Sequence, residues 1–535
     1  MAISYILKTI CKRQFTLLIL LLAPLLLLPI PIVINNQAGS CGYVVLLMMI
    51  FWLTEAVPLA VTALIPVALF PFFGILGSED VCKIYMKEII MMLFGGLVIA
   101  IAIEHSNLHK RIALRVLLMV GSKPRWLLAG FMTITMVLSM WLSNSATTAM
   151  MVPIVDAVLI ELQTGEVSPS RSKALRKCMM IGTAYAANLG GIGTIIGTGP
   201  NLVLKAFADD NYGLKHGLTF ASWMLFNIPG MLICIVIAWV WLQINYLGFK
   251  KTSESEQEAS ANIKNVLRTK YKELGRLTFH EIMILVLFAI IVALWFFRAP
   301  LFMPGWSDLI EGVTVKGSAP VILISFLMFV IPAQPNNFKH GEKSPTLVNW
   351  QVIHQRMPWS LLLLIGGGLA MAEGIKTSCL SHWIGNQVLV LKDLHPALIL
   401  FILTFIATFL TEVASNTATA SIFFPILKEV ASALEINPLY LMLGVAVSCS
   451  FAFMFPVATP PNAIVFEAGK MKIKDMAKTG FVMNLLCIGV INLMMNTYGD
   501  YMFNFKGFPD WAQTIQDNGT TVDKLTLKCQ AMLNL

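Results

Sequence analysis

Stretches of about 20 consecutive apolar residues recur along this chain between residues 16 and 498. A helix needs about that length to cross a hydrocarbon core of about 30 Å, and it satisfies its own backbone hydrogen bonds while it does so. The chain has 535 residues, 57% of them hydrophobic and 13% charged, which is too few polar residues to cover a soluble protein of this length. The sequence therefore predicts an all-α polytopic membrane protein.

We count eleven candidate membrane spans. They cover residues 16–34, 44–56, 57–75, 89–104, 178–207, 219–247, 279–297, 317–333, 359–375, 438–466 and 478–498. Two apolar segments, 126–162 and 394–434, stay outside this count because each is too long for one span. Each also begins and ends on the same side of the membrane in this topology. Both are predicted to be re-entrant hairpins, which are stable at membrane depth only inside protein or beside a wet cavity.

Basic residues lie in the connections between the apolar stretches and predict the orientation of the chain. Lys8, Lys12 and Arg13 precede the first span, which places the N-terminus in the cytoplasm by the positive-inside rule. An odd number of spans then places the C-terminus outside, where Asn518 begins a glycosylation sequon. We assign the net charge of +9 to topology and expect no nucleic-acid partner. A cleaved signal peptide is disfavoured, because the first apolar run is longer than a typical signal sequence.

Three short motifs occur twice, in the same order, once in each half of the chain. The central motif is Ser143-Asn144-Ser145 in the first copy and Ser415-Asn416-Thr417 in the second, and a proline follows both at the same spacing. A glycine motif precedes each copy, Leu93–Leu97 and Ile365–Leu369, and a broken-helix motif follows each, Gly197–Asn201 and Ala458–Asn462. Such self-similarity indicates an internal repeat.

Charge around the two hairpins indicates that the repeats are inverted. The first hairpin has basic residues on both flanks, whereas the second has few. The ends of the first hairpin are therefore expected inside and those of the second outside. Inverted repeats are typical of transporters, with the binding site at the repeat interface.

The motifs combine small polar side chains with interrupted helices. Helix N-termini favour carboxylates and other anions, whereas free carbonyls with Ser, Thr and Asn oxygens suit a hard cation such as Na⁺. Lys and Arg are absent between Leu127 and Leu162 and between Leu394 and Leu427. A multiply charged anion could not be neutralised there by basic side chains, so we expect co-bound cations. The alternative is that Ser and Asn only pack helices together, which the identical spacing of two copies disfavours.

Acidic residues and cysteines are weaker candidates. The carboxylates in or beside apolar stretches are Glu104, Asp156, Glu373 and Glu412, and Glu412 is the best of them because it lies three residues before Ser415. The nine cysteines have no Cys-x-x-Cys spacing and are read as packing residues. No catalytic constellation or organic-cofactor motif is found in the apolar stretches, so no enzyme is predicted.

These motifs, together with Asn107–Leu114 and Ser450–Asn462, resemble the divalent anion and sodium symporter family over nearly the whole chain, specifically its animal di- and tricarboxylate cotransporters. The resemblance implies a homodimeric, elevator-type plasma-membrane transporter that contacts membrane lipid and imports citrate, succinate and related carboxylates with Na⁺. It implies N-terminal scaffold helices in 1–105, the first hairpin and broken helix in 106–248, a cytoplasmic linker in 249–278, further scaffold helices in 279–392, the second hairpin and broken helix in 393–500, and an extracellular tail in 501–535. Sodium-coupled sulfate symport and carboxylate exchange are the alternatives.

The resemblance also implies a residue set for the site. Substrate would contact Ser143, Asn144, Ser145, Ser415, Asn416, Thr417, Thr198, Gly199, Pro200, Thr459, Pro460 and Pro461. Sodium would be held by Ser139, Ser143, Asn144, Gly199 and Asn201 in one half and by Thr411, Asn416, Ala458 and Asn462 in the other. Ser145 stands where the family usually has Thr, and Ile192 and Ile196 stand where relatives often have smaller residues, which leaves the preferred carboxylate open. Gly199-Pro200 favours the carboxylate branch over the sulfate branch.

Overall fold

The computed structural model describes residues 2–120, 123–163, 169–213, 215–248, 254–300, 303–310, 312–335 and 344–512. Within these ranges the regular structure is helical, and the only β-pairing is an isolated bridge between Pro332 and Thr346. The predicted glycosylation site, Asn518, lies outside the described residues. The predicted all-α class is confirmed for the part of the chain that is described.

Among the described residues, long apolar helices occupy seven of the eleven segments predicted to cross the membrane. By length and composition, spans are possible over Thr16–Ile34, Gln37–Thr54, Ser78–His105, Phe220–Leu247, Phe279–Phe296, Trp359–Thr377 and Ile473–Phe503. Shorter apolar helices include Leu59–Phe72, Ser318–Val330 and Pro438–Ser448. The chain is a multi-pass membrane protein.

The helices before the first repeated motif are α1 (Ala2–Leu27), α2 (Pro29–Ile34), α3 (Gln37–Thr54), α4 (Leu59–Thr62), α5 (Ile65–Phe72) and α6 (Ser78–Ile84). The first motif-bearing half continues with α7 (Glu88–His105), α8 (Leu108–Met119), α9 (Pro124–Ser139), α10 (Asn144–Gln163), α11 (Pro169–Gly191), α12 (Gly199–Tyr212) and α13 (Phe220–Leu242). After α14 (Glu254–Glu273), α15 (Phe279–Phe296), α16 (Ser318–Val330) and α18 (Trp350–Arg356), the second half has α19 (Trp359–Thr377), α20 (Leu380–Val388), α21 (Pro396–Thr411), α22 (Asn416–Ala433), α23 (Pro438–Ser448), α24 (Pro460–Ala468), α25 (Ile473–Met494) and α26 (Asp500–Phe503).

The sequence repeat is also a structural repeat. The N-cap residues Asn107 of α8 and Cys379 of α20 both adopt a left-handed conformation, with φ values of 60° and 64°. The preceding serines, Ser106 and Ser378, each donate a hydrogen bond to the carbonyl three residues earlier. Matched backbone breaks of this kind show that the helices from α7 to α13 have counterparts from α19 to α25.

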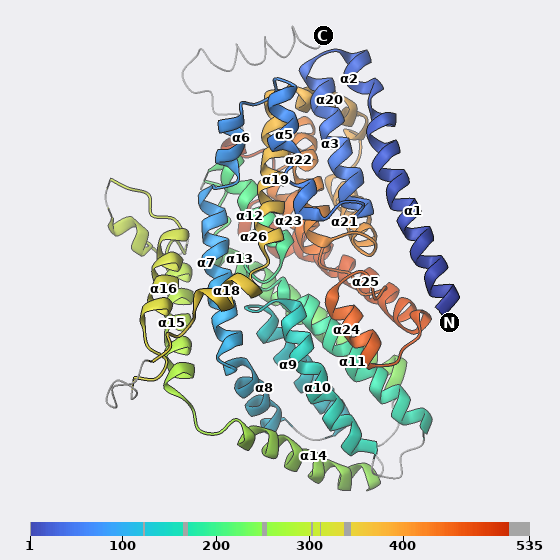
Figure 1. Cartoon of the computed structure of the whole chain (residues 1–535), viewed down its shortest axis with the longest axis vertical. Coiled ribbons are helices and arrows are strands. Elements are labelled where there is room, and N and C mark those ends of the chain that lie inside the picture. Colours follow the sequence, from blue (N-terminus) through green and yellow to red (C-terminus); the bar gives the residue numbers. More distant parts are fainter. Residues whose placement is uncertain are drawn as a thin grey trace.

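Each predicted hairpin is a pair of helices joined by a short non-helical tip. Proline begins α9 and α21, where its missing N–H costs nothing. The paired helices α10 and α22 begin at Asn144 and Asn416, directly after the tips. Hairpin α9–α10 and hairpin α21–α22 lie toward opposite ends of the long axis of the molecule (Figure 1).

The third motif breaks a long apolar segment into two helices in each half, as predicted. Helix α11 ends at Gly191 and α12 begins at Gly199; α23 ends at Ser448 and α24 begins at Pro460. The carbonyls freed in the first break, those of Gly191 and Thr194, accept hydrogen bonds from Asn201 at 2.9 and 2.8 Å.

The same device closes the second break. Asn462 donates to the carbonyls of Ala452 and Phe455 at 2.8 and 3.0 Å. One asparagine in each half therefore replaces backbone hydrogen bonds that the interrupted helix has lost.

The charge run over 249–276 favours a solvated, partly helical connection between the halves, and the described part of this linker is helical but not wholly solvated. It contains α14, which packs against α8 and α10, and its Ile263 and Leu267 are buried. Arg111 of α8 binds Glu281 with a Nε–Oε1 distance of 2.8 Å and donates to the carbonyl of Gly275 at 2.9 Å. The charges in the sequence indicated the polar face of this helix, but they gave no sign that its other face is buried.

Glu412 holds the second break in place. Its buried carboxylate accepts hydrogen bonds from the backbone N–H groups of Phe453, Met454 and Phe455, and from the side-chain amide of Asn484 at 2.7 Å. Hydrogen bonds to an ionised acceptor are stronger than those between neutral groups. The acid singled out from sequence therefore positions the backbone of the broken helix.

We expect Glu412→Gln to lower the melting temperature of the purified protein. The amide offers one oxygen to four donors, and we expect a loss of roughly 2–3 kcal/mol for the bonds that are not replaced. Thermal unfolding followed by size-exclusion chromatography measures the effect. Exposed Glu467 provides the control variant Glu467→Gln, and equal melting temperatures for both variants would contradict the anchoring role.

Candidate functional site

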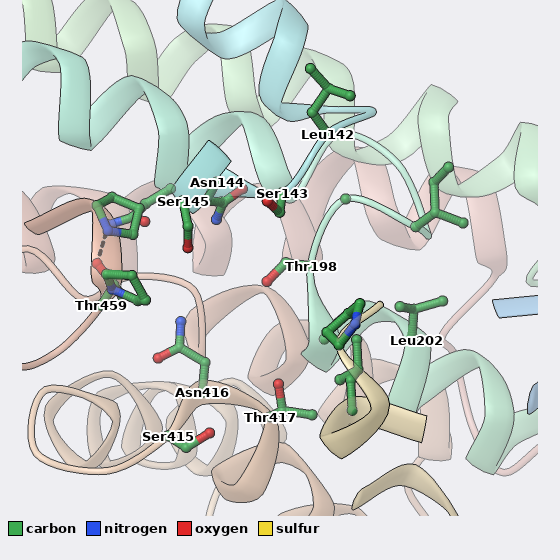
Figure 2. Close-up of a pocket in the computed structure, with 18 of the residues that line it drawn as sticks. Leu142, Ser143, Asn144, Ser145, Thr198, Leu202, Ser415, Asn416, Thr417 and Thr459 are labelled. Carbon is green, nitrogen blue, oxygen red and sulfur yellow. Dashed lines mark hydrogen bonds between the residues drawn. The ribbon is translucent and has the colours of Figure 1, made fainter. Parts of the chain in front are cut away.

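The two hairpin tips and the two broken helices meet around one cavity of about 740 Å³. Ser143, Asn144 and Ser145 lie on one side of it and Asn416 and its neighbours lie on the other (Figure 2). The residues that sequence analysis assigned to the site and that line this cavity are Ser143, Asn144, Ser145, Thr198, Gly199, Ser415, Asn416, Thr417, Ala458, Thr459, Pro460 and Pro461. Residues from both halves of the chain are thus brought to one place.

Helix N-termini face this cavity from both halves. Thr198 and Thr459 are the N-cap residues of α12 and α24, and each has an extended backbone. The hydroxyl of Thr459 accepts a hydrogen bond from the Asn462 N–H at 3.4 Å. Ser415 is the N-cap of α22, and Ser143 accepts from the Ala146 N–H in the first turn of α10. Their partial positive charges make the cavity favourable for an anion.

Other predicted residues lie behind the cavity wall. Ser139 is fully buried and donates to the Asn144 side-chain oxygen at 2.6 Å and to the Ala187 carbonyl at 2.8 Å. Thr411 repeats this arrangement with Asn416 and with the Cys449 carbonyl, at 3.0 Å from the latter. Each hydroxyl therefore joins a tip asparagine to the broken segment of its own half.

Asn201, Asn462 and Pro200 are also buried and do not line the cavity. The Asn201 oxygen has no hydrogen-bond partner within the described part of the chain, and the same holds for the hydroxyls of Thr147 and Thr419. These three groups lie in the first turns of α12, α10 and α22. Buried oxygens of this kind can serve as ligands for a hard cation such as Na⁺.

Gly199 is the point at which the halves come closest. A Cβ atom on Gly199 would lie 2.0 Å from the Thr417 hydroxyl oxygen. Helix α12 packs against α22 in the same region. The N-terminus of a helix in the first half therefore approaches the hairpin tip of the second half too closely for any side chain.

Asn188 is a site residue that sequence analysis missed. It lines the cavity from α11 and donates to the Ala452 carbonyl at 3.3 Å and to the Thr459 hydroxyl at 3.2 Å. It also donates to the Asn462 oxygen at 3.3 Å. An amide in the middle of the apolar segment 178–207 was the available signal, but nothing in the sequence showed that it reaches the other half.

One part of the cavity lining is apolar. It is formed by residues of α4 and α7 and by the segment that begins α19, namely Leu59, Leu93, Gly96, Leu97, Ala100, Pro358 and Leu361. Among the described residues, Glu55 is the only charged side chain that lines the cavity. Sequence analysis assigned no role to Glu55, which falls inside the predicted span 44–56.

The remaining sequence candidates lie elsewhere. Glu104 pairs with Arg356 at 3.3 Å and Asp156 pairs with Arg176 at 2.6 Å, so both serve as ion-pair partners outside the cavity. Glu373 is half-buried in α19 and does not line it. No group of three His, Cys, Asp or Glu side chains that could hold a metal ion is found among the described residues.

Ile192 and Ile196, where relatives often have smaller residues, differ in their position relative to the cavity. Ile196 lines the cavity, whereas Ile192 is buried and its carbonyl accepts the Trp223 indole N–H at 3.0 Å. Ser145 belongs to the first tip and lines the cavity, and its hydroxyl points into the cavity (Figure 2). Of these departures, Ile196 and Ser145 are therefore placed to affect what binds.

Comparison with known proteins agrees with this geometry. The model of the sodium:sulfate symporter transmembrane region matches residues 9–505. The Na⁺/citrate cotransporter of Rattus norvegicus is 40% identical over 96% of this chain and 99% of its own length. The Na⁺/dicarboxylate cotransporter 3 of Rattus norvegicus is 38% identical over 95% of both chains.

A solved structure shares the fold at much lower identity. The YdaH transporter of Alcanivorax borkumensis superimposes with a TM-score of 0.52 over 79% of this chain and 87% of that chain, at 10% identity. The family model covers most of the chain, and the curated relatives match nearly its full length. The chain therefore belongs to the divalent anion and sodium symporter family, which is a family of transporters and not of enzymes.

Proposed function

We propose that this protein is a secondary active symporter that imports di- and tricarboxylates such as citrate and succinate together with Na⁺. The observation that carries the proposal is the pairing of two hairpin tips and two helix N-termini around a cavity that no Lys or Arg of the described chain lines. The names of the relatives point to the same cargo. A plasma-membrane location, a cytoplasmic N-terminus and an external C-terminus are part of the proposal.

The charge of the substrate explains the coupling. Each helix N-terminus contributes only about half a unit of partial positive charge, which is less than the full charge of a single carboxylate. Na⁺ ions beside the tips would supply the missing charge. Substrate affinity would then depend on Na⁺, and the two ions and the anion would move together.

Two sodium sites are proposed, one in each half. Ser139, Ser143, Asn144, Gly199 and Asn201 would surround one ion, and Thr411, Asn416, Ala458 and Asn462 the other. The hydroxyl–amide pairs Ser139–Asn144 and Thr411–Asn416 support this assignment, because they bring hard oxygen ligands together in equivalent places. The unpartnered Asn201 oxygen offers a further ligand in the first half.

Transport is proposed to follow an elevator mechanism in a homodimer embedded in lipid, with about eleven spans and two re-entrant hairpins arranged as inverted repeats. The position of the hairpins toward opposite ends of the molecule supports this arrangement (Figure 1). The apolar wall of α4, α7 and α19 supports it as well. The apolar side chains of this lining make no hydrogen bonds that the moving part would have to break.

Replacing Na⁺ with choline should abolish uptake of radiolabelled citrate and succinate by cells expressing this protein. The physical reason is that the anion would enter a cavity without compensating positive charge. Uptake that is undiminished in choline would contradict sodium coupling, with untransfected cells as the control.

Asn144→Ala and Asn416→Ala should each lower Na⁺-dependent uptake by at least about tenfold while surface expression stays intact. Ser139 and Thr411 hold the oxygens of these two amides. Each substitution removes the amide that would contact a substrate carboxylate, and loss of one hydrogen bond to a charged group is worth roughly 1.5–3 kcal/mol. Gln351→Ala, at an exposed position of α18, is the matched control. Normal uptake in both tip variants would contradict the assigned site.

Sulfate symport and carboxylate exchange are the competing activities. Unlabelled sulfate should compete weakly with succinate, because the relatives at about 40% identity are named as citrate and dicarboxylate cotransporters. Preloading cells with succinate should not be required for uptake. Strong competition by sulfate, or uptake only into preloaded cells, would favour the corresponding alternative.

A further inference from the structure

Glu55 is an acid in a cavity that we propose to bind anions. It is the C-cap residue of α3, and its side chain is exposed. It lines the cavity at the start of the turn that leads from α3 to α4. No other titratable residue of the described chain lines this cavity. Its negative charge is therefore not balanced by a cation in the cavity wall.

The local backbone gives Glu55 no structural reason to be glutamate. Its φ and ψ of 49° and 31° place it in the left-handed region, where Gly or Asn is favoured. It also places a negative charge at the negative end of the α3 dipole. Residues that break several local preferences at once, without a compensating contact, are typical of functional positions.

We infer that Glu55 sets the charge selectivity of the cavity, lowering its affinity for trianions relative to dianions. A fixed carboxylate repels each anion in proportion to the anion's charge, so a third carboxylate on the substrate adds one further unit of repulsion. The effect acts through space and needs no contact between Glu55 and the substrate. Glu55 is not among the residues assigned to binding substrate or Na⁺.

The inference rests on the proposed function and can be tested in the same transport assay. At mildly alkaline pH succinate is a dianion and citrate a trianion, so the ratio of their KM values reports charge selectivity. Glu55→Gln should lower the KM for citrate relative to that for succinate by about two- to tenfold, as expected for one unit charge acting across a wet cavity. Glu55→Asp, which keeps the charge, should retain the wild-type ratio.

A matched control exists after α22. Glu435 is also an exposed glutamate in the left-handed region, with φ of 55°, but it does not line the cavity. Glu435→Gln should leave the KM ratio unchanged. The same shift in both glutamine variants would overturn the inference, because it would arise from the backbone and not from charge in the cavity.

Ionic strength provides a second measurement, which can be made on the wild-type protein alone and repeated on the variant. Raising ionic strength with choline chloride at constant Na⁺ screens the carboxylate and should lower the citrate-to-succinate KM ratio of the wild type. The same change should have little effect on Glu55→Gln. A wild-type ratio that is independent of salt would overturn the inference.

The wild-type measurements separate the two possible failures. Wild-type protein that takes up neither acid with Na⁺ would overturn the proposed function and this inference together. Wild-type protein that takes up both acids, with the same KM ratio in Glu55→Gln, would overturn the role of Glu55 alone.

Discussion

The central constraint in this protein is that broken helices inside a membrane must have their freed backbone groups satisfied. Asn201 and Asn462 hydrogen-bond to carbonyls of the two breaks, and Glu412 accepts three N–H groups of the second. With those groups satisfied, the N-termini of α12 and α24 are free to face the cavity. The polarity of the site therefore depends on side chains that lie behind it.

Duplication explains why the site is made of small polar residues. Each half supplies a tip, a helix N-terminus and a hydroxyl that joins the tip to the helix before the break, and only together do the halves enclose the cavity. Asn188 connects them directly, because its amide belongs to the first half while its partners Thr459 and Asn462 belong to the second. In the function that we propose, charge from helix ends and co-bound Na⁺ takes the place of basic side chains, which would be costly to bury.

Much of this arrangement could be predicted from sequence because it rests on periodicity and spacing. Apolar run length predicted the spans, and the repeated motifs predicted the tips and breaks around Ser143, Ser415, Thr198 and Thr459. The buried face of α14 and the reach of Asn188 could not be predicted, because both depend on contacts between segments distant in the chain. Glu55 was missed for a related reason: its turn connects two spans, and only the fold shows that this turn borders the cavity.

The close approach of Gly199 to Thr417 links the histories of the two halves. After a gene duplication each copy can ordinarily accumulate substitutions independently, with its partner unaffected. Here a methyl group added at one position in the first copy would displace a hydroxyl in the second. The space between Gly199 and Thr417 thus belongs to both halves. A larger side chain on either side of this space must be accommodated by both halves.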